Sequence, residues 1–340
     1  VMSEYKGIKG FQVQTRTENP SPTEVQTGDF YYNSTSGQFK TINTGGAPIG
    51  AFSSGGDLNT SRNSASSAGT QTAMIAMGGE PDRTDSEQYN GSSWTSTPST
   101  NDPHYSGTGF GTYTSALIAG GFNPGNTSKN VELWDGSSWS TATDMTNRRY
   151  TASGSPQGPQ SAGIVFGGVS AWPTSSGSAN VLVEEWNGSS WTEVGDLNNT
   201  RSYSSGAGNA EAALAISGYV GWTGAPPAGP TKADTVEAYD GTSWTDHSEI
   251  NTARFIFNAS FGTQTTAISA GGEEPSQSGK TEAYNGSSWT EVADLATARG
   301  RGAAAGTASA GAVAGGGPPN KANTEEWNAA DFEIKTVTTS

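Results

Sequence analysis

The stretch that decides the fold is ELWDGSSW, residues 132–139, because close copies of it recur along the chain. EQYNGSSW stands at 87–94, EEWNGSSW at 184–191, EAYDGTSW at 237–244 and EAYNGSSW at 282–289. A sixth, degenerate copy keeps Glu325, Trp327 and Asn328, with Phe332 at the place of the closing tryptophan. Successive closing aromatics are 43 to 53 residues apart. The chain therefore contains six repeats of one structural unit.

Each unit divides into four short segments that have the pattern of β-strands. An acid-Leu/Ile-x3-Arg phrase such as Asp144 to Arg149 precedes a run of small residues, which suits a crowded innermost strand. An apolar strand ending in paired glycines follows, as in AMIAMGG at 73–79, and continuous apolar runs are typical of strands buried on both faces. The Glu-x-Tyr/Trp strand, an Asn-Gly or Asp-Gly hairpin turn with positive φ angles, and the closing Trp strand complete the unit. A repeat of this length is typical of one four-stranded propeller blade.

The paired glycines, the Glu-x-Tyr and the closing Trp resemble the kelch repeat of β-propellers. The resemblance implies an all-β fold, a six-bladed kelch-like β-propeller over residues 57–335 preceded by a short N-terminal β-hairpin segment. Two units depart from the pattern: unit 2 has Ser99 and His104 for the acid and the arginine, and unit 4 has Ser217 before Gly218. The predicted blades span residues 57–96, 99–141, 144–193, 196–246, 249–291 and 294–335.

Residues 1–50 lie outside the repeat and contain a predicted hairpin, in which aromatic strands flank a Ser/Thr/Gly turn over Gly28 to Lys40. Too little chain follows the sixth unit to complete a seventh blade, so we interpret the hairpin as a separate element or an extra edge strand. The segment is similar to short N-terminal hairpins of phage tail and virion proteins, and SEYKGIKGF at 3–11 resembles the start of structural proteins of marine, cyanophage-like bacteriophages. The resemblance implies that residues 1–50 attach the chain to other virion proteins.

The amino-acid composition disfavours several kinds of binding partner and of active site. The 17 Lys and Arg against 32 Asp and Glu leave a net charge of −15, which disfavours a nucleic-acid partner. No apolar run approaches the length of a membrane helix, and the first ten residues lack the pattern of a signal peptide. Without cysteine and with only His104 and His247, the chain offers no usual zinc site or Cys-His nucleophile. We therefore expect no membrane insertion, no metal and no cofactor.

Six repeated acids and six repeated bases occupy equivalent positions of the units. The acids are Glu87, Glu132, Glu184, Glu237, Glu282 and Glu325. The bases are Arg62, His104, Arg149, Arg201, Arg254 and Arg299. One interpretation is a ring of arginines around a channel mouth that binds an anion. The favoured interpretation is one structural Glu–Arg pair in each unit, because a ligand site normally breaks the symmetry of a repeat.

The insertions that lengthen units 3 and 4 break this symmetry. Trp172 lies in the first insertion and Trp222 in the second, with Tyr219 close by, and both fall between the second and third strands of adjacent units. We expect the insertions on one face, side by side, where flat aromatic rings stack on a sugar or on an apolar patch of a partner. The alternative is that each tryptophan folds over its own blade. Trp172, Trp222 and Tyr219 are the predicted ligand-binding residues, and no catalytic residue is predicted.

These observations favour a non-enzymatic virion protein of a phage, as a tail fibre, receptor-binding or capsid-surface component present in many copies on one particle. Its predicted partners are other virion proteins through residues 1–50 and a host-surface glycan at Trp172, Trp222 and Tyr219. The alternative is a secreted or surface-bound bacterial kelch lectin. A glycan-active enzyme similar to sialidases is less favoured, since the turns before each Trp do not match the Ser-x-Asp-x-Gly-x-Thr-Trp motif of those enzymes.

Overall fold

Every regular element is a β-strand in the part of the chain that the structure, a computed structural model, describes. The described residues are 14–16, 30–35, 37–43, 50–171, 179–220, 231–257, 259–274, 276–329 and 333–336. No helix occurs among them. The predicted all-β class is confirmed.

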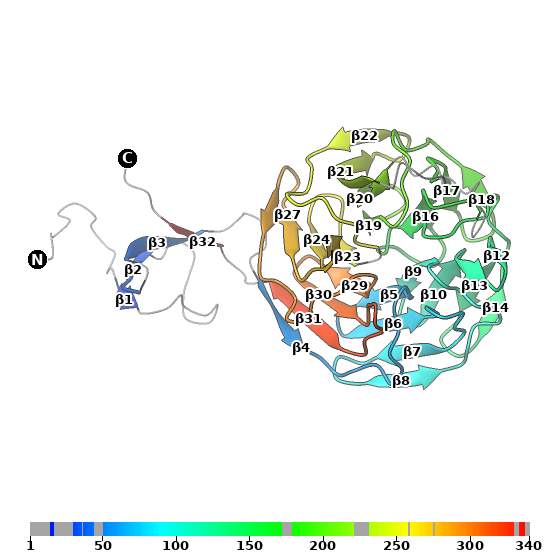
Figure 1. Cartoon of the computed structure of the whole chain (residues 1–340), viewed down its shortest axis with the longest axis horizontal. Helices are drawn as coiled ribbons and strands as arrows, with labels where there is room; N and C mark the ends of the chain where they lie inside the picture. Colours follow the sequence, from blue (N-terminus) through cyan, green and yellow to red (C-terminus); the bar gives the residue numbers. More distant parts are fainter. Residues whose placement is uncertain are drawn as a thin grey trace, which may run out of the picture.

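Six four-stranded sheets come from residues 50–329 and are arranged around a common centre (Figure 1). The first two are β5 (Ser66–Thr70), β6 (Ala73–Met77), β7 (Ser86–Tyr89) and β8 (Trp94–Thr97), then β9 (Thr108–Thr112), β10 (Ser115–Ala119), β13 (Val131–Trp134) and β14 (Trp139–Thr141). The next two are β15 (Ser153–Gly154), β16 (Gly163–Phe166), β17 (Val183–Trp186) and β18 (Trp191–Glu193), then β19 (Ser205–Gly208), β20 (Ala213–Val220), β21 (Thr231–Tyr239) and β22 (Trp244–His247). The last two are β23 (Ser260–Gly262), β24 (Ala267–Ala270), β27 (Thr281–Tyr284) and β28 (Trp289–Glu291), then β29 (Ala303–Thr307), β30 (Ala310–Ala314), β31 (Thr324–Ala329) and β4 (Gly50–Ser54).

Within each sheet the strands pair antiparallel, and the small-residue strand lies innermost. Two short hairpins, β11–β12 (Phe122–Asn123 with Asn126–Thr127) and β25–β26 (Glu273–Glu274 with Ser276–Gln277), extend connections between second and third strands. The arrangement is a β-propeller-like ring of radial sheets. The five predicted units from residue 57 to residue 291 each correspond to one sheet.

The Asn-Gly and Asp-Gly segments form four-residue loops, which are longer than the tight hairpin turn that the sequence predicts. Tyr89 pairs with Trp94 across the loop, and Gly91 alone of the Asn-Gly pair has a positive φ, at 88°. Asn90 instead caps the loop, since its side-chain oxygen accepts the backbone N–H groups of Ser92 at 3.0 Å and Ser93 at 2.9 Å. The repeated serines therefore belong to the loop and the following Trp opens the strand.

The paired glycines let each sheet approach the next one closely. Gly78 and Gly79 have φ angles of 62° and 114°, and a Cβ atom on Gly78 would stand 2.7 Å from the carbonyl oxygen of His104 in the next sheet. Ser217 takes the first glycine position in unit 4 at a φ of 59°, and its hydroxyl donates to the carbonyl oxygens of Ala233 and Arg254. Ser217 therefore keeps the close contact between the fourth unit and the fifth, although it replaces a glycine of the repeat.

The hydrophobic core consists of layers between neighbouring sheets. In one layer Leu214, Ile216 and Val236 of the fourth sheet lie against Tyr284 and Trp289 of the fifth. The closing tryptophans also tie sheets together by hydrogen bonds, since the indole of Trp289 donates to the carbonyl of Ser248 at 3.0 Å. Trp94, Trp139, Trp191, Trp244 and Trp289 are all buried, which is the place the repeat predicts for them.

The prediction that Phe332 closes the sixth unit, and hence the boundary at residue 335, is wrong. The fourth strand of that sheet is β4, from the opposite end of the chain, and Trp327 pairs with Phe52 in the register of β31 and β4. Phe332 itself lies outside the described residues. A strand from one end of the chain thus joins strands from the other and closes the ring, as Figure 1 shows beside β31.

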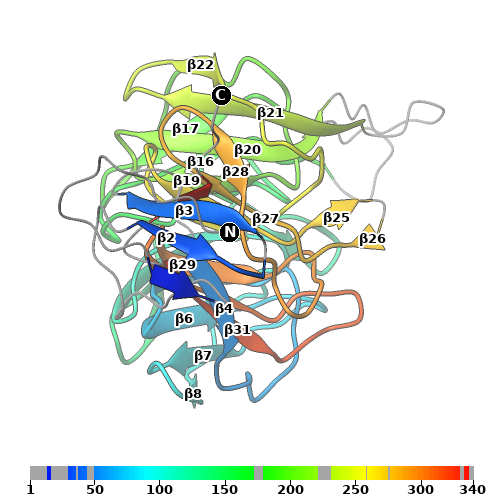
Figure 2. The same cartoon turned by 90° about the vertical axis from the view of Figure 1, so that its left-hand side faces the viewer.

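A seventh four-stranded sheet, the terminal sheet, lies to one side of the ring (Figures 1 and 2). It contains β1 (Gln14–Arg16), β2 (Phe30–Asn33), β3 (Gln38–Asn43) and β32 (Glu333–Thr336). The predicted hairpin is confirmed as the antiparallel pair of β2 and β3. The sequence did not predict that residues 333–336 pair with β3, or that residue 50 already belongs to the ring.

Candidate functional site

The repeated bases and acids form one buried pair in every sheet of the ring. The N–O distances are 2.6 Å for Arg62–Glu87, 3.1 Å for His104–Glu132, 2.8 Å for Arg149–Glu184, 2.9 Å for Arg201–Glu237, 2.5 Å for Arg254–Glu282 and 2.6 Å for Arg299–Glu325. Their side chains are almost completely buried. The alternative of an open arginine ring that binds an anion is therefore wrong.

Each pair also fixes the chain that enters its sheet. Glu184 accepts the backbone N–H groups of Thr146 at 2.7 Å and Asn147 at 3.2 Å, while Arg149 donates to the carbonyl oxygens of Gly167 and Leu182. In unit 2, His104 replaces the arginine and its ring contacts Gly120 O at 2.8 Å. Burial alone would raise the pKa of Glu132, but the hydrogen bonds from His104, Asn101 and Asp102 outweigh burial and lower it. The repeated charges serve the architecture.

The axis of the ring is nearly filled. Its cavity measures about 10 Å³ and is lined by small residues of the innermost strands and their flanks, namely Ser67, Thr108, Gly109, Gly154, Pro156, Ser205, Gly206, Ser260 and Ala304. A cavity of this size holds about one water molecule. This cavity therefore has no room for a ligand larger than water.

The face where the repeated bases enter the sheets has its own ring of residues, two positions after the base in five units and three positions after it, at Phe257, in the fifth unit. Ser64, Ser106, Thr151, Tyr203 and Arg301 share φ angles between 52° and 59°. Backbone N–H groups link them around the axis: Ser64 to Arg301 O (2.8 Å), Ser106 to Ser64 O (3.1 Å), Thr151 to Ser106 O (3.0 Å), Tyr203 to Thr151 O (3.1 Å) and Phe257 to Tyr203 O (3.3 Å). The backbone repeats around this ring while the side chains change from small hydroxyls to Tyr203, Phe257 and Arg301.

Aromatic side chains gather on this face, which we call the aromatic face. Tyr150, Tyr203, Phe255 and Phe257 form its buried part, and Tyr105, Phe122 and Tyr219 pack against them partly exposed. Tyr219 lies 5.1 Å from Phe255 and 5.8 Å from Tyr203 between ring centroids, and Tyr105 lies 5.5 Å from Tyr150. These contacts hold the exposed rings in fixed positions.

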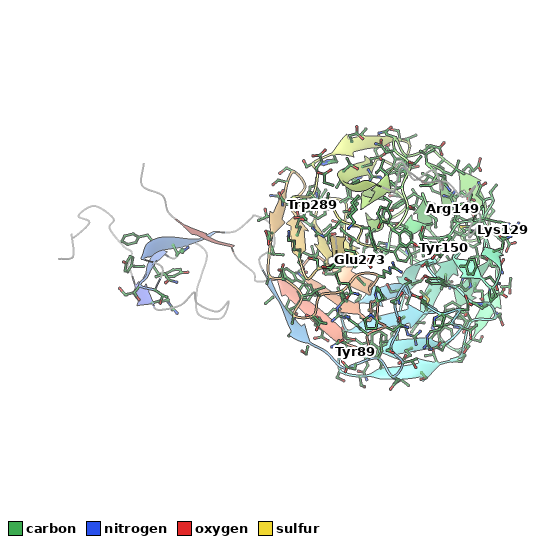
Figure 3. The ribbon with its side chains drawn as sticks, viewed as in Figure 1. Tyr89, Lys129, Arg149, Tyr150, Glu273 and Trp289 are labelled. Carbon is green, nitrogen blue, oxygen red and sulfur yellow. The ribbon has the colours of Figure 1, made fainter. Side chains whose placement is uncertain are left out.

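Arg301 and Glu273 place opposite charges on the aromatic face. The guanidinium carbon of Arg301 lies 5.7 Å from the ring centroid of Tyr203 and 5.6 Å from that of Phe255, within cation–π distance. Arg301 Nε is 3.3 Å from Glu273 Oε1, and the two side chains are 22% and 17% exposed. Figure 3 shows Glu273 and Tyr150 near the centre of the ring, while Tyr89 and Trp289 lie toward its rim. The pair therefore differs from the six repeated pairs in position and in access to solvent.

The titration of these groups reflects their burial. Burial raises the pKa of Tyr203 to about 12 and also raises the pKa of Tyr150 and Tyr219. Burial raises the pKa of Glu273 as well, opposed by the charges of Arg301 and Lys232. At neutral pH the phenols are thus protonated hydrogen-bonding groups. The Arg301 guanidinium stays charged, because the attraction of Glu273 and nearby phenols outweighs its burial.

One of the three predicted ligand-binding residues lies on this face. Tyr219, near the end of β20, is part of the aromatic face. Trp172 and Trp222 lie outside the described residues, so their prediction stays untested. The flanks of the two insertions are described, and they hold equivalent positions in adjacent sheets: Val169 bonds to the backbone of Tyr150, and Tyr219 to that of Ser202. The described residues that precede both insertions thus lie at the aromatic face.

Sequence reasoning missed Arg301, Glu273, Tyr203 and Tyr150. A signal existed in the position two residues after each repeated base, where Ser64 and Ser106 are small but Tyr203 and Arg301 are large. A second signal is Glu273, which follows the paired glycines where Phe122 and Val169 stand in other units. Comparison of the units with one another, beyond the residues they share, would have identified both positions.

In the described residues, no group of three or more His, Asp or Glu side chains is placed to hold a metal ion. None of the elements in this part of the chain is a helix of the length and hydrophobicity that crossing a membrane requires.

Comparison with known proteins supports the fold. No protein-family model matches the chain, and no curated protein matches it in sequence. Among solved structures, 305 chains are similar in structure. One of these, described as "Structure of YjhT", has a TM-score of 0.65 and 12% sequence identity, and the match covers 83% of this chain and 99% of that chain. At this identity the similarity concerns the fold alone.

Proposed function

We propose that residues 50–329 form a six-bladed kelch-like β-propeller. Six four-stranded sheets support the proposal, because each corresponds to one sequence repeat and all six carry the same buried base–acid pair. The sixth blade is completed by β4, a strand from before the first repeat. Joining of distant parts of the chain within one blade stabilises a ring of this kind, because the first and last sheets cannot separate without breaking the hydrogen bonds between β4 and β31.

We propose further that this protein is a non-enzymatic virion structural protein of a phage, and that its aromatic face binds a glycan of the host surface. The observation that carries the binding role is the break in symmetry at one face of a repeated ring, where partly exposed Tyr105, Phe122 and Tyr219 belong to the aromatic cluster on which the Arg301–Glu273 pair lies. Aromatic rings stack on the apolar faces of sugars, and a fixed ring loses little entropy when it does so. A rigid platform present in many copies gives useful adhesion from weak single sites.

The virion location is supported by the resemblance of residues 1–50 to phage proteins. The terminal sheet is a separate group of strands beside the ring, which suits an attachment element. A chain lacking residues 1–43 keeps β4 and therefore the closed ring. We expect this variant to remain folded and to be lost from particles. A chain that still assembles onto particles would contradict the attachment role, and neighbouring secretion genes in place of capsid and tail genes would favour the alternative of a surface lectin.

Binding is tested with purified full-length protein on host cells and on their isolated surface polysaccharide. We expect saturable binding of the wild type, much weaker binding of Tyr219→Ala, and wild-type binding of Tyr113→Ala. Tyr113 is a partly exposed tyrosine between β9 and β10, so it stands at the opposite end of its sheet from the aromatic face. Absence of binding, or equal loss in both variants, would contradict the proposal. Release of sugar products would instead indicate a glycan-active enzyme.

A further inference from the structure

The Arg301–Glu273 pair has hydrogen-bonding capacity that the ring does not use. Arg301 Nε and Glu273 Oε1 are buried against each other at 3.3 Å, whereas the two side chains as a whole are 22% and 17% exposed, so the other polar atoms of the pair face solvent. A guanidinium carries five N–H donors and a carboxylate about four acceptor sites. A partner that supplies both a donor and an acceptor can therefore bind to the solvent-facing atoms of the pair.

The pair stands beside the partly exposed ring of Tyr219. Tyr219 and Arg301 both pack against Phe255 and Tyr203, with Tyr219 at 5.1 Å and 5.8 Å between ring centroids and Arg301 at 5.6 Å and 5.7 Å. Glu273 is joined to Phe255 through its backbone N–H at 3.0 Å. A flat ligand on Tyr219 therefore has the charged pair at its edge, which is the arrangement that a ring with polar substituents on its rim requires.

The charges decide between a neutral and an acidic ligand. Glu273 balances Arg301, so a carboxylate on the ligand would have to compete with a carboxylate already 3.3 Å from the guanidinium. The whole chain adds a net charge of −15, which repels anions. A hydroxyl group both accepts from Arg301 and donates to Glu273, and it leaves the pair intact. Hydroxyl groups on adjacent carbons satisfy both side chains at once.

We propose that Arg301 and Glu273 form a subsite for two neighbouring hydroxyl groups of an uncharged pyranose sugar stacked on Tyr219. The inference rests on the proposed glycan-binding function and specifies its substrate class. Arg301 donates to one hydroxyl oxygen, and Glu273 accepts from the other hydroxyl. A sugar that carries a carboxylate at these positions is excluded by Glu273.

The test is a calorimetric titration of full-length protein with two probe sets, neutral hexose oligosaccharides and oligouronates of matched length. We expect the wild type to bind a neutral probe and to bind oligouronates more weakly. Glu273→Gln, which keeps the shape but loses the charge, and Arg301→Lys should each weaken neutral binding by roughly tenfold or more, since hydrogen bonds to charged groups are of that strength. Thermal melts of both variants check that they are folded.

Glu80→Gln is the matched control, because Glu80 follows Gly78 and Gly79 as Glu273 follows Gly271 and Gly272. This variant should bind like the wild type. Glu273→Gln should bind oligouronates more tightly than the wild type does, because the substitution removes the carboxylate that excludes them. Preference of the wild type for oligouronates would overturn the neutral-sugar inference while the glycan-binding function stands. Unchanged neutral binding by folded Glu273→Gln and Arg301→Lys would also overturn it. Binding of neither probe set would contradict both proposals.

Discussion

Phe52 and Trp327 pack together with their ring centroids 5.2 Å apart, although one lies before the first repeat and the other in the last. Their strands, β4 and β31, pair antiparallel over five residues, so this contact lies at the closure of the ring. Sheets in such a ring stabilise one another through shared layers, and the closing contact belongs to the layer between the fifth and sixth sheets.

Phe52→Ala is therefore expected to lower the free energy of unfolding by about 1–3 kcal/mol, a range for a partly buried aromatic side chain. Chemical denaturation followed by tryptophan fluorescence measures the effect. Ser53→Ala, an exposed position of the same strand, is the control and should change little. Equal midpoints for Phe52→Ala and the wild type would show that β4 does not stabilise the ring.

Arg149→Ala should be among the most destabilising single substitutions, at about 3–5 kcal/mol, because Glu184 would keep a buried charge without its partner. Lys129→Ala is the matched comparison. Lys129 pairs with Asp144 at 3.4 Å, but both side chains are about 40% exposed, and exposed pairs contribute about 0–1 kcal/mol. Denaturation midpoints of the two variants should differ clearly. A loss as small for Arg149→Ala as for Lys129→Ala would contradict the structural role of the repeated pairs.

Protonation of Glu132 is expected to cause part of the loss of stability of the ring at acid pH. Its pKa in the folded chain is lower than 4.5, so the folded chain binds fewer protons than the unfolded chain in this range. The stability that Glu132 contributes is complete above its unfolded pKa and is lost as pH falls through the lower, folded value. The melting temperature should fall more steeply between pH 7 and pH 3 for the wild type than for Glu132→Gln. Parallel declines would contradict this assignment.

The tryptophans of the two insertions remain predicted ligand-binding residues. Trp172→Ala combined with Trp222→Ala is expected to abolish adsorption to host cells or to their isolated polysaccharide, because two flat aromatic rings able to stack on a sugar are lost. The thermal melt should stay close to that of the wild type. Normal adsorption of the folded double variant would remove both residues from the site. A large loss of stability would favour the alternative that they pack over their own blades.

The repeat predicted most of the fold because it encodes contacts that every unit makes in the same way. The buried Glu–Arg pairs, the apolar second strands and the closing tryptophans such as Trp289 could all be placed from their spacing. Closure of the ring could not be predicted in this way. The strand at residues 50–54 shares no repeated phrase with the other closing strands, and its partner β31 lies at the far end of the sequence.

The candidate site could be predicted only in part, since it depends on how the units differ. Tyr219 was identified from its place beside an insertion. Arg301 and Glu273 come from different units. Each stands just after a repeated motif, at a position where the residue differs between units. Their 3.3 Å contact arises from the circular arrangement of the sheets, which brings the units together around one axis. A site formed by side chains from several units becomes visible only when the ring is assembled.

The central claim, that the aromatic face binds a glycan, is tested most directly by hydroxyl-radical footprinting of the full-length protein with and without host-surface polysaccharide. Tyr105, Phe122 and Tyr219 are partly exposed on that face, and Tyr113 is partly exposed at the opposite one. We predict that saturating polysaccharide lowers the oxidation of Tyr105, Phe122 and Tyr219 and leaves that of Tyr113 unchanged. Unchanged oxidation of all four residues, or protection of Tyr113 alone, would contradict the account.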